Sequence, residues 1–235
     1  FWLAMGMDNV ALGWLVLEMT NSPFMVGVTF TARLAPQFVF GILSGAVADR
    51  VGRRALLRYL SLGAGVNALL LASLLLMDAA AIWLIIIWVV MAGSLFAFIQ
   101  TARYAYTYDV VGKTHALGGL ALTGIGARVG GIGGALLSGV LVVKIGIGVQ
   151  YLFVCVAYLS AGIVCLAMRH PGYSSFAKRD SVMENLVGYV QIVRGNLTLQ
   201  LLMLLTSIIG VLGFSIHALL PVLARDVLDV GADGL

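Results

Sequence analysis

Charged side chains are scarce in this sequence. Lys, Arg, Asp and Glu together make up 10% of its 235 residues, whereas soluble domains carry roughly 25%. Hydrophobic residues make up 61%, and the mean hydropathy is +1.06. This composition excludes an ordinary soluble domain and predicts an integral membrane protein.

Cysteine is scarce as well, with two residues, Cys155 and Cys165. They fall in one apolar run, ~15 Å apart along a helix, which is too far for a disulfide. No Cys-x-x-Cys spacing is present for a metal. A disulfide scaffold and a zinc module are therefore excluded, and we interpret both cysteines as packing residues.

Motifs for catalysis and nucleotide binding are missing too. The sequence has no Gly-x-x-x-x-Gly-Lys-Ser/Thr loop, no His-Glu-x-x-His pair and no Gly-x-Ser-x-Gly elbow. We therefore expect neither an ATP-driven pump nor another enzyme, and no cofactor or metal. The net charge is +4, but most basic residues flank apolar runs and none form a basic-aromatic patch, so no nucleic-acid partner is expected.

Long apolar runs, in contrast, follow one another along the whole chain. Each is long enough to cross a hydrocarbon core of ~30 Å at ~1.5 Å per residue. The predicted fold is an all-α membrane protein with about seven spans, at 1–17, 25–48, 55–77, 81–102, 116–143, 147–168 and 198–222.

These spans predict three regions. Residues 1–168 form a six-helix half, 169–196 a cytoplasmic linker with a short amphipathic helix, and 197–235 the first helix of a second half. The sequence starts inside an apolar run and stops just after another, so we expect a longer protein whose remaining helices complete a cavity wall.

Basic residues alternate in number between the predicted loops. Lys and Arg favour cytoplasmic loops near span ends, and one side has most of them: Arg50, Arg53, Arg54, Arg58, Arg103, Lys113, Arg169, Lys178, Arg179 and Arg194. The other side has Lys144 and Arg225. The loop around Arg50 is therefore predicted to be cytoplasmic.

Three ionisable residues, Asp8, Arg33 and Arg128, fall near the middle of predicted spans. An ionised group at the bilayer centre costs ~2.5–3.5 kcal/mol even on insertion scales, so it faces a partner or a watery cavity. Asp8 and Arg33 lie at similar depths on antiparallel helices and can meet as an ion pair. Gln37 follows Arg33 on the same helical stripe, so these four residues are candidates for a substrate or proton pathway.

Three interpretations of Asp8 and Arg33 stay open. The pair could hold two helices together and do nothing else. Asp8 could instead accept a proton and couple proton entry to solute exit, or the pair could contact substrate.

The fifth predicted span is rich in glycine. Gly126, Gly130, Gly133 and Gly134 fall on one helical stripe, whereas Arg128 falls on the opposite face with Gly124, Gly131 and Ala135. Small residues allow helix backbones to approach closely in lipid. One face is therefore predicted to pack while the other carries the charge.

A short charged turn joins the second and third spans and reads Gly-Ala-Val-Ala-Asp-Arg-Val-Gly-Arg-Arg from Gly45 to Arg54. It resembles the Gly-x-Leu-Ala-Asp-Arg-x-Gly-Arg-Lys loop of major facilitator superfamily transporters. The resemblance implies a cytoplasmic gate at the matching positions, which are Gly45, Asp49, Arg50, Gly52, Arg53 and Arg54.

Two further resemblances point to exporters in this superfamily. Gly126, Gly130, Gly131 and Gly134 resemble the fifth-span motif Gly-x-x-x-Gly-Pro-x-x-Gly-Gly, with Gly131 in place of Pro and Ala135 in place of the last Gly. Segments 20–23, 33–36 and 220–225 resemble the bacterial branch with enterobactin exporters and macrolide-efflux proteins.

The resemblance implies a function as well as a fold. The complete protein would have about twelve helices in two halves that rock around a central site. We expect a monomeric, multi-pass transporter of a bacterial inner membrane that exports amphipathic small molecules in exchange for protons. An uptake permease is the alternative on the same fold, and a non-transporting membrane scaffold is a more distant one.

Overall fold

The computed structural model describes residues 1–168, 191–206, 208–209 and 223, and it describes the backbone but not the side chains of residues 42, 46, 49 and 50. Within residues 1–168 the chain forms helices α1 (Trp2–Thr20), α2 (Pro23–Arg50), α3 (Arg53–Leu76), α4 (Ile82–Ile145) and α5 (Ile147–Ala167). Residues 191–195 and Leu197–Thr206 are also helical.

Local sequence explains where the helices begin and end. Asn21 adopts a left-handed conformation (φ 49°) that ends α1. Ser22 then accepts a hydrogen bond from the backbone N–H of Met25, and Pro23 starts α2, as expected of a serine N-cap followed by proline. Asp78, with φ 51°, lies in the turn after α3.

Helix α4 corrects the predicted boundaries of the fourth and fifth spans. The sequence predicted separate spans at 81–102 and 116–143, but α4 is helical over 64 residues except for Gly112, whose φ is 69°. No proline interrupts residues 103–111, so the helix continues past the predicted end. Gly112 has no Cβ and tolerates the positive φ, so it divides α4 into two segments.

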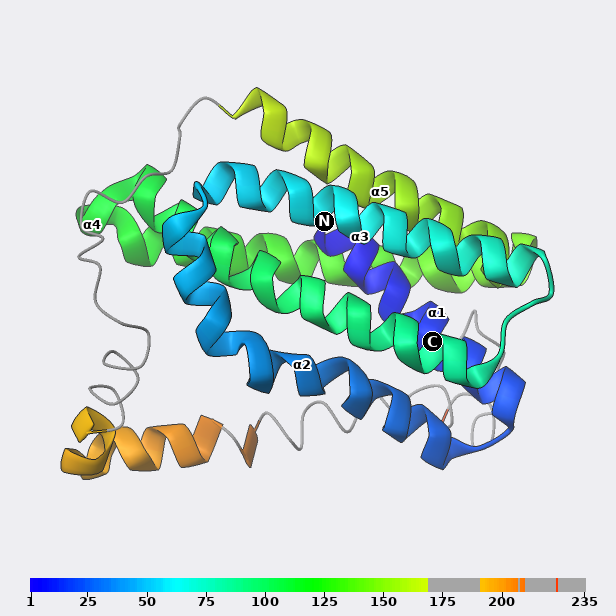
Figure 1. Ribbon diagram of the computed structural model, residues 1–235, viewed down its shortest axis with the longest axis horizontal. Coiled ribbons are helices and arrows are strands. Elements are labelled where there is room, and N and C mark those ends of the chain that lie inside the picture. Colours follow the sequence, from blue (N-terminus) through cyan, green and yellow to red (C-terminus); the bar gives the residue numbers. More distant parts are fainter. Residues whose placement is uncertain (169–190, 207, 210–222, 224–235) are drawn as a thin grey trace.

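The helices alternate in direction and form a bundle (Figure 1). Helix α3 packs mainly on α5, whereas α1 and α2 both pack mainly on α4. The end of the bundle that holds Arg53 and Arg54 is called the arginine end here. The turns at Asn21, Asp78 and Gly146 lie at the opposite end.

Glycines allow several of these helices to touch through their backbones. A Cβ on Gly6 or Gly134 would collide with the backbone of the facing helix, because Gly6 lies against Gly131 and Gly134 against Leu3. Gly93 of α4 lies in the same way against the carbonyl of Arg33. This close approach brings polar side chains of four helices together in the bundle interior.

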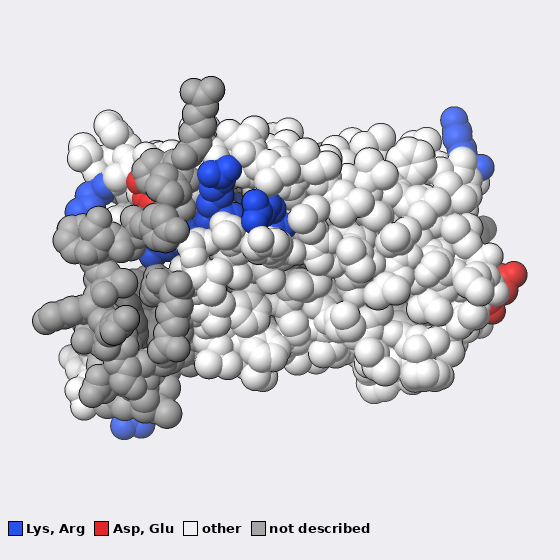
Figure 2. Space-filling model, turned by 45° about the horizontal axis from the view of Figure 1, so that its top comes forward, with Lys and Arg blue, Asp and Glu red and all other residues white. Residues whose placement is uncertain are grey.

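The outer surface suits a membrane. In Figure 2 charged side chains extend from one end to about the middle of the view and reappear at the opposite end, with a broad uncharged surface between them. Many large apolar side chains are exposed, among them Phe38, Val66, Ile87, Ile132 and Val156. Of the helices in the described residues, α3, α4 and α5 are both long and apolar enough to cross a bilayer, and at 64 residues α4 has length for two crossings.

The predictions for the second half fall mostly outside the described residues. These include most of the linker at 169–196 and the seventh span beyond residue 209. The residues 220–225 that resemble one exporter branch are outside them too, apart from Leu223. The division into 1–168, 169–196 and 197–235 stays a prediction.

Candidate functional site

The predicted pair between Asp8 of α1 and Arg33 of α2 forms. Arg33 Nη2 donates to Asp8 Oδ2 over 2.5 Å, and both residues are buried, with exposed fractions of 7% and 2%. The Tyr151 hydroxyl of α5 donates to the second carboxylate oxygen, Oδ1, over 3.0 Å. The carboxylate therefore joins three helices, with a hydrogen bond on each oxygen.

A second buried network lies one residue away on both α1 and α5. The carbonyl of Met7 accepts hydrogen bonds from Ser138 Oγ at 3.0 Å and from Gln150 Nε2 at 3.2 Å. Gln150 Nε2 also donates to Ser138 Oγ. Since Gln150 and Ser138 are fully buried, this network ties α5 and the second segment of α4 to α1 directly beside Asp8.

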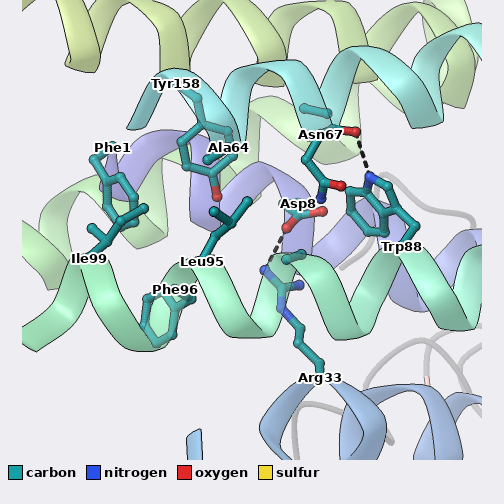
Figure 3. Close-up of a pocket in the computed structure, with 12 residues that line it drawn as sticks. Phe1, Asp8, Arg33, Ala64, Asn67, Trp88, Leu95, Phe96, Ile99 and Tyr158 are labelled. Carbon is teal, nitrogen blue, oxygen red and sulfur yellow. Dashed lines mark hydrogen bonds and ion pairs between the residues drawn. The ribbon is translucent and has the colours of Figure 1, made fainter. Parts of the chain in front are cut away.

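A small cavity borders the ion pair (Figure 3). It encloses about 20 Å³, and its polar lining consists of Asp8, Arg33, Asn67 of α3 and Tyr158 of α5. Trp88 of α4 lines it as well and donates its indole N–H to the backbone carbonyl of Asn67 over 2.6 Å. The remaining lining is apolar or aromatic: Phe1, Ala64, Ala68, Ala92, Leu95, Phe96 and Ile99.

The arginine end contains a second ion pair, between Arg53 at the start of α3 and Asp109 in the first segment of α4. Arg53 Nη1 donates to Asp109 Oδ1 over 2.5 Å and to the carbonyl of Ala105 over 3.2 Å. The two charged side chains are 11% and 7% exposed. Arg53 thus connects the turn after α2 to the middle of α4.

The neighbouring Arg54 connects the same turn to α5. Its Nε donates to the carbonyl of Cys165 over 3.2 Å, and its Nη2 donates to that of Leu166 over 2.8 Å. These carbonyls belong to the last turn of α5, where a cation also interacts favourably with the helix dipole. The two arginines together fasten α3 to α4 and α5.

Comparison with known proteins identifies the family of this chain. Residues 3–234 match the model of the family MFS_3, described as transmembrane secretion effector. The chain belongs to this family of the major facilitator superfamily. No match was found among curated proteins, and none among solved structures. Membership makes this all-α chain a multi-pass membrane transporter, as the sequence predicted, without singling out the branch with enterobactin and macrolide exporters.

The other predicted pathway residues of this transporter lie apart from the ion pair. Gln37 is partly exposed and Arg128 is exposed, and neither has a hydrogen bond or ion pair among the described residues. Ser44 follows Arg33 and Gln37 on the same helical stripe; it is fully buried, and its hydroxyl lies 2.7 Å from the Thr101 hydroxyl of α4. The stripe on α2 therefore turns toward α4 as it approaches the arginine end.

Only part of the predicted glycine stripe of this MFS transporter packs against another helix. Gly130 and Gly134 lie against Trp2 and Leu3 of α1, whereas a Cβ on Gly126 or Gly133 would meet nothing within 4 Å. Gly131 has open space on its own side, and its carbonyl faces Gly6.

Of the predicted gate, Gly52 forms the N-cap of α3 and Gly45 lies within α2. The side chains of Asp49 and Arg50 are outside the described part of the chain. Arg53 and Arg54 make the contacts given above. Within the described residues, the gate hypothesis therefore rests on these two arginines.

Three residues that complete these sites were missed from the sequence. Tyr151 and Asn67 lie inside apolar spans, and Asp109 lies beyond the predicted end of the fourth span. A polar residue within an apolar run was the available signal for the first two. An acidic residue close to an arginine-rich turn was the signal for Asp109.

Nowhere among the described residues do three His, Cys, Asp or Glu side chains come close enough together to hold a metal ion.

Proposed function

We propose that this MFS transporter exports amphipathic small molecules and that Asp8 couples export to proton entry. The family description names secretion, which supports export over uptake. The observation that supports the coupling proposal is the Asp8–Arg33 pair: the Asp8 carboxylate is buried inside the bundle and bonded to Arg33 of α2 and Tyr151 of α5.

Protonation supplies a physical coupling step. A proton on Asp8 removes the negative charge that pairs with Arg33, and the buried guanidinium then lacks a counter-ion. A buried charge without its partner is costly, so α1 and α2 separate or Arg33 moves toward water. Loss of the proton restores the pair, which gives two states of the bundle that differ by one proton.

The Arg53–Asp109 pair provides the second part of the mechanism. It holds α3 against α4 at the arginine end, which we place in the cytoplasm because of its many cations. In this proposal the pair stabilises the state closed at that end and breaks when the cavity opens inward. Ion pairs of this kind shift an equilibrium between two conformations without contacting the solute.

The test is transport by Asp8→Asn in liposomes that contain the complete protein and an imposed proton gradient. We expect gradient-driven dye efflux to be lost while dye binding persists. Asp78→Asn is the matched control, because Asp78 is an exposed carboxylate in the turn after α3, and it should transport normally. Gradient-driven efflux by Asp8→Asn at the native rate would contradict the coupling role.

A further inference from the structure

Two buried polar atoms of residues that line the cavity beside Asp8 have no hydrogen-bond partner within the described part of the chain. They are Arg33 Nη1, a donor, and Asn67 Oδ1, an acceptor. Arg33 and Asn67 are 7% and 4% exposed. Leaving a buried polar group unpaired is costly, so each of these atoms calls for a hydrogen-bond partner in the cavity.

The size of the cavity limits that ligand. It encloses about 20 Å³, and one water molecule needs at least about 10–15 Å³ measured in this way. The space therefore admits a single small molecule and excludes a solute of drug size.

Charge selects among the small candidates. An anion would be attracted by Arg33 but repelled by Asp8 and by the carbonyl oxygen of Asn67. A cation would suit the two oxygens but would face the Arg33 guanidinium. A neutral molecule that accepts one hydrogen bond and donates others satisfies all three groups, and water has this property.

We propose that one ordered water molecule occupies this cavity, accepting from Arg33 Nη1 and donating to Asn67 Oδ1, and that it relays protons to Asp8. The relay rests on the proposed coupling function. In each transfer the water gives one proton to the carboxylate and receives another from the solvent side, so the water is regenerated and one proton is gained by Asp8.

Trp88 offers a direct probe of the water. It lines the cavity and is 5% exposed, so bulk solvent hardly reaches it. Hydroxyl radicals produced from water by X-ray pulses modify side chains that touch ordered water, and mass spectrometry reports the modified residue. We expect rapid modification of Trp88 in the complete native protein.

Two variants of α3 make the probe specific. Asn67→Leu removes the acceptor and fills the cavity, and it should lower Trp88 modification severalfold. Ser73→Leu is the control, because Ser73 is exposed and bonds only the carbonyl of Leu70. Asn67→Asp keeps the hydrogen-bond acceptor, so Trp88 should be modified about as fast as in the native protein. Slow modification of Trp88 in the native protein, or equal modification in Asn67→Leu, would overturn the water site.

The relay has its own readout in infrared spectra after a pH jump. The band of protonated Asp8 should appear severalfold more slowly in Asn67→Leu than in Ser73→Leu. If Trp88 modification falls but this rate stays unchanged, the relay is wrong and the water remains. If Asp8→Asn leaves gradient-driven efflux intact, the coupling function fails while Trp88 modification still decides the water site.

Discussion

At the scale of the residue, the carboxylate of Asp8 is buried and bonded on both of its oxygens. Arg33 balances its charge and Tyr151 satisfies its second oxygen. Removal of water from both ions is costly, so such a pair is poor evidence for a gain in stability. The presence of this buried pair inside apolar helices is instead consistent with a carboxylate that changes its charge during transport.

A double-mutant cycle tests the energy of this pair. Arg33→Met leaves Asp8 buried without its counter-ion, and Asp8→Asn leaves Arg33 in the same condition. We expect each single change to destabilise the protein by about 3–5 kcal/mol and the double change to cost much less than the sum. Thermal unfolding in detergent measures the stability of the native protein, the two single variants and the double variant.

Arg58→Met is the control for that cycle. Arg58 stacks on Tyr59, with its guanidinium carbon 4.4 Å from the ring centre, and makes no ion pair with another described residue, so its loss should change stability little. Strictly additive losses for Asp8 and Arg33 would show that the two charges do not interact.

At the scale of the helix, glycine decides how closely the elements pack. Gly93 allows the backbone of α4 to reach the carbonyl of Arg33, and this contact sets the position from which the Arg33 side chain extends to Asp8. Close packing of α2 on α4 and the geometry of the ion pair are therefore linked.

Alanine substitutions along α4 test this link. Gly93→Ala would force a methyl group into the carbonyl of Arg33, so we expect a lower unfolding temperature. Gly118→Ala has open space around it and should be neutral or stabilising by up to about 1 kcal/mol, since alanine favours helices over glycine. Thermal unfolding of both variants provides the measurement. Equal effects of the two substitutions would argue against the close contact between α4 and α2 at Gly93.

The arginine end can be tested with a thiol that the chain already contains. Cys165 is buried beside Leu56, Ala102 and Tyr106, and Cys155 is buried elsewhere in α5. Loss of the Arg53–Asp109 pair should favour opening at this end. A bias of about 1–3 kcal/mol corresponds to a change of roughly 5–150-fold in population.

We therefore expect Asp109→Asn to speed modification of Cys165 by a membrane-permeant maleimide about fivefold or more, with Cys155 unchanged. Asp78→Asn again serves as the matched carboxylate control. Equal reaction rates of Cys165 in Asp109→Asn and the native protein would show that the Arg53–Asp109 pair does not control opening at the arginine end.

At the scale of the whole molecule, orientation follows from the distribution of charge. Among the described residues, most Lys and Arg lie toward the arginine end, and we predict that this end is cytoplasmic because such loops favour the cytoplasm. Cysteines introduced at exposed positions of the two ends, Asp78→Cys and His115→Cys, should report this orientation.

On intact cells an impermeant maleimide should label Asp78→Cys and leave His115→Cys unmodified, and inside-out vesicles should show the reverse. The native thiols, Cys155 and Cys165, are buried, so their low labelling serves as the background. The opposite pattern would invert the transporter and the proposed direction of proton flow.

Hydropathy and charge, read from the sequence, predicted the membrane class, the helical spans and the shared depth of Asp8 and Arg33, because these depend on residue spacing along a helix. Spacing did not reveal the continuation of α4 to Val111 or the turn at Gly112, because the apolar-to-polar change at residue 103 resembles a helix end. The sequence likewise left open which glycines contact a neighbouring helix.

What the sequence determined by itself is therefore the solvent of this protein, a lipid bilayer, together with a predicted depth for the ionisable groups inside its apolar runs. Only the tertiary structure decided which groups meet: Tyr151 with Asp8, Asp109 with Arg53, and Asn67 with the cavity beside Arg33. The reason is physical, since depth depends on position along one helix, whereas contact depends on how neighbouring helices rotate and how closely their backbones approach.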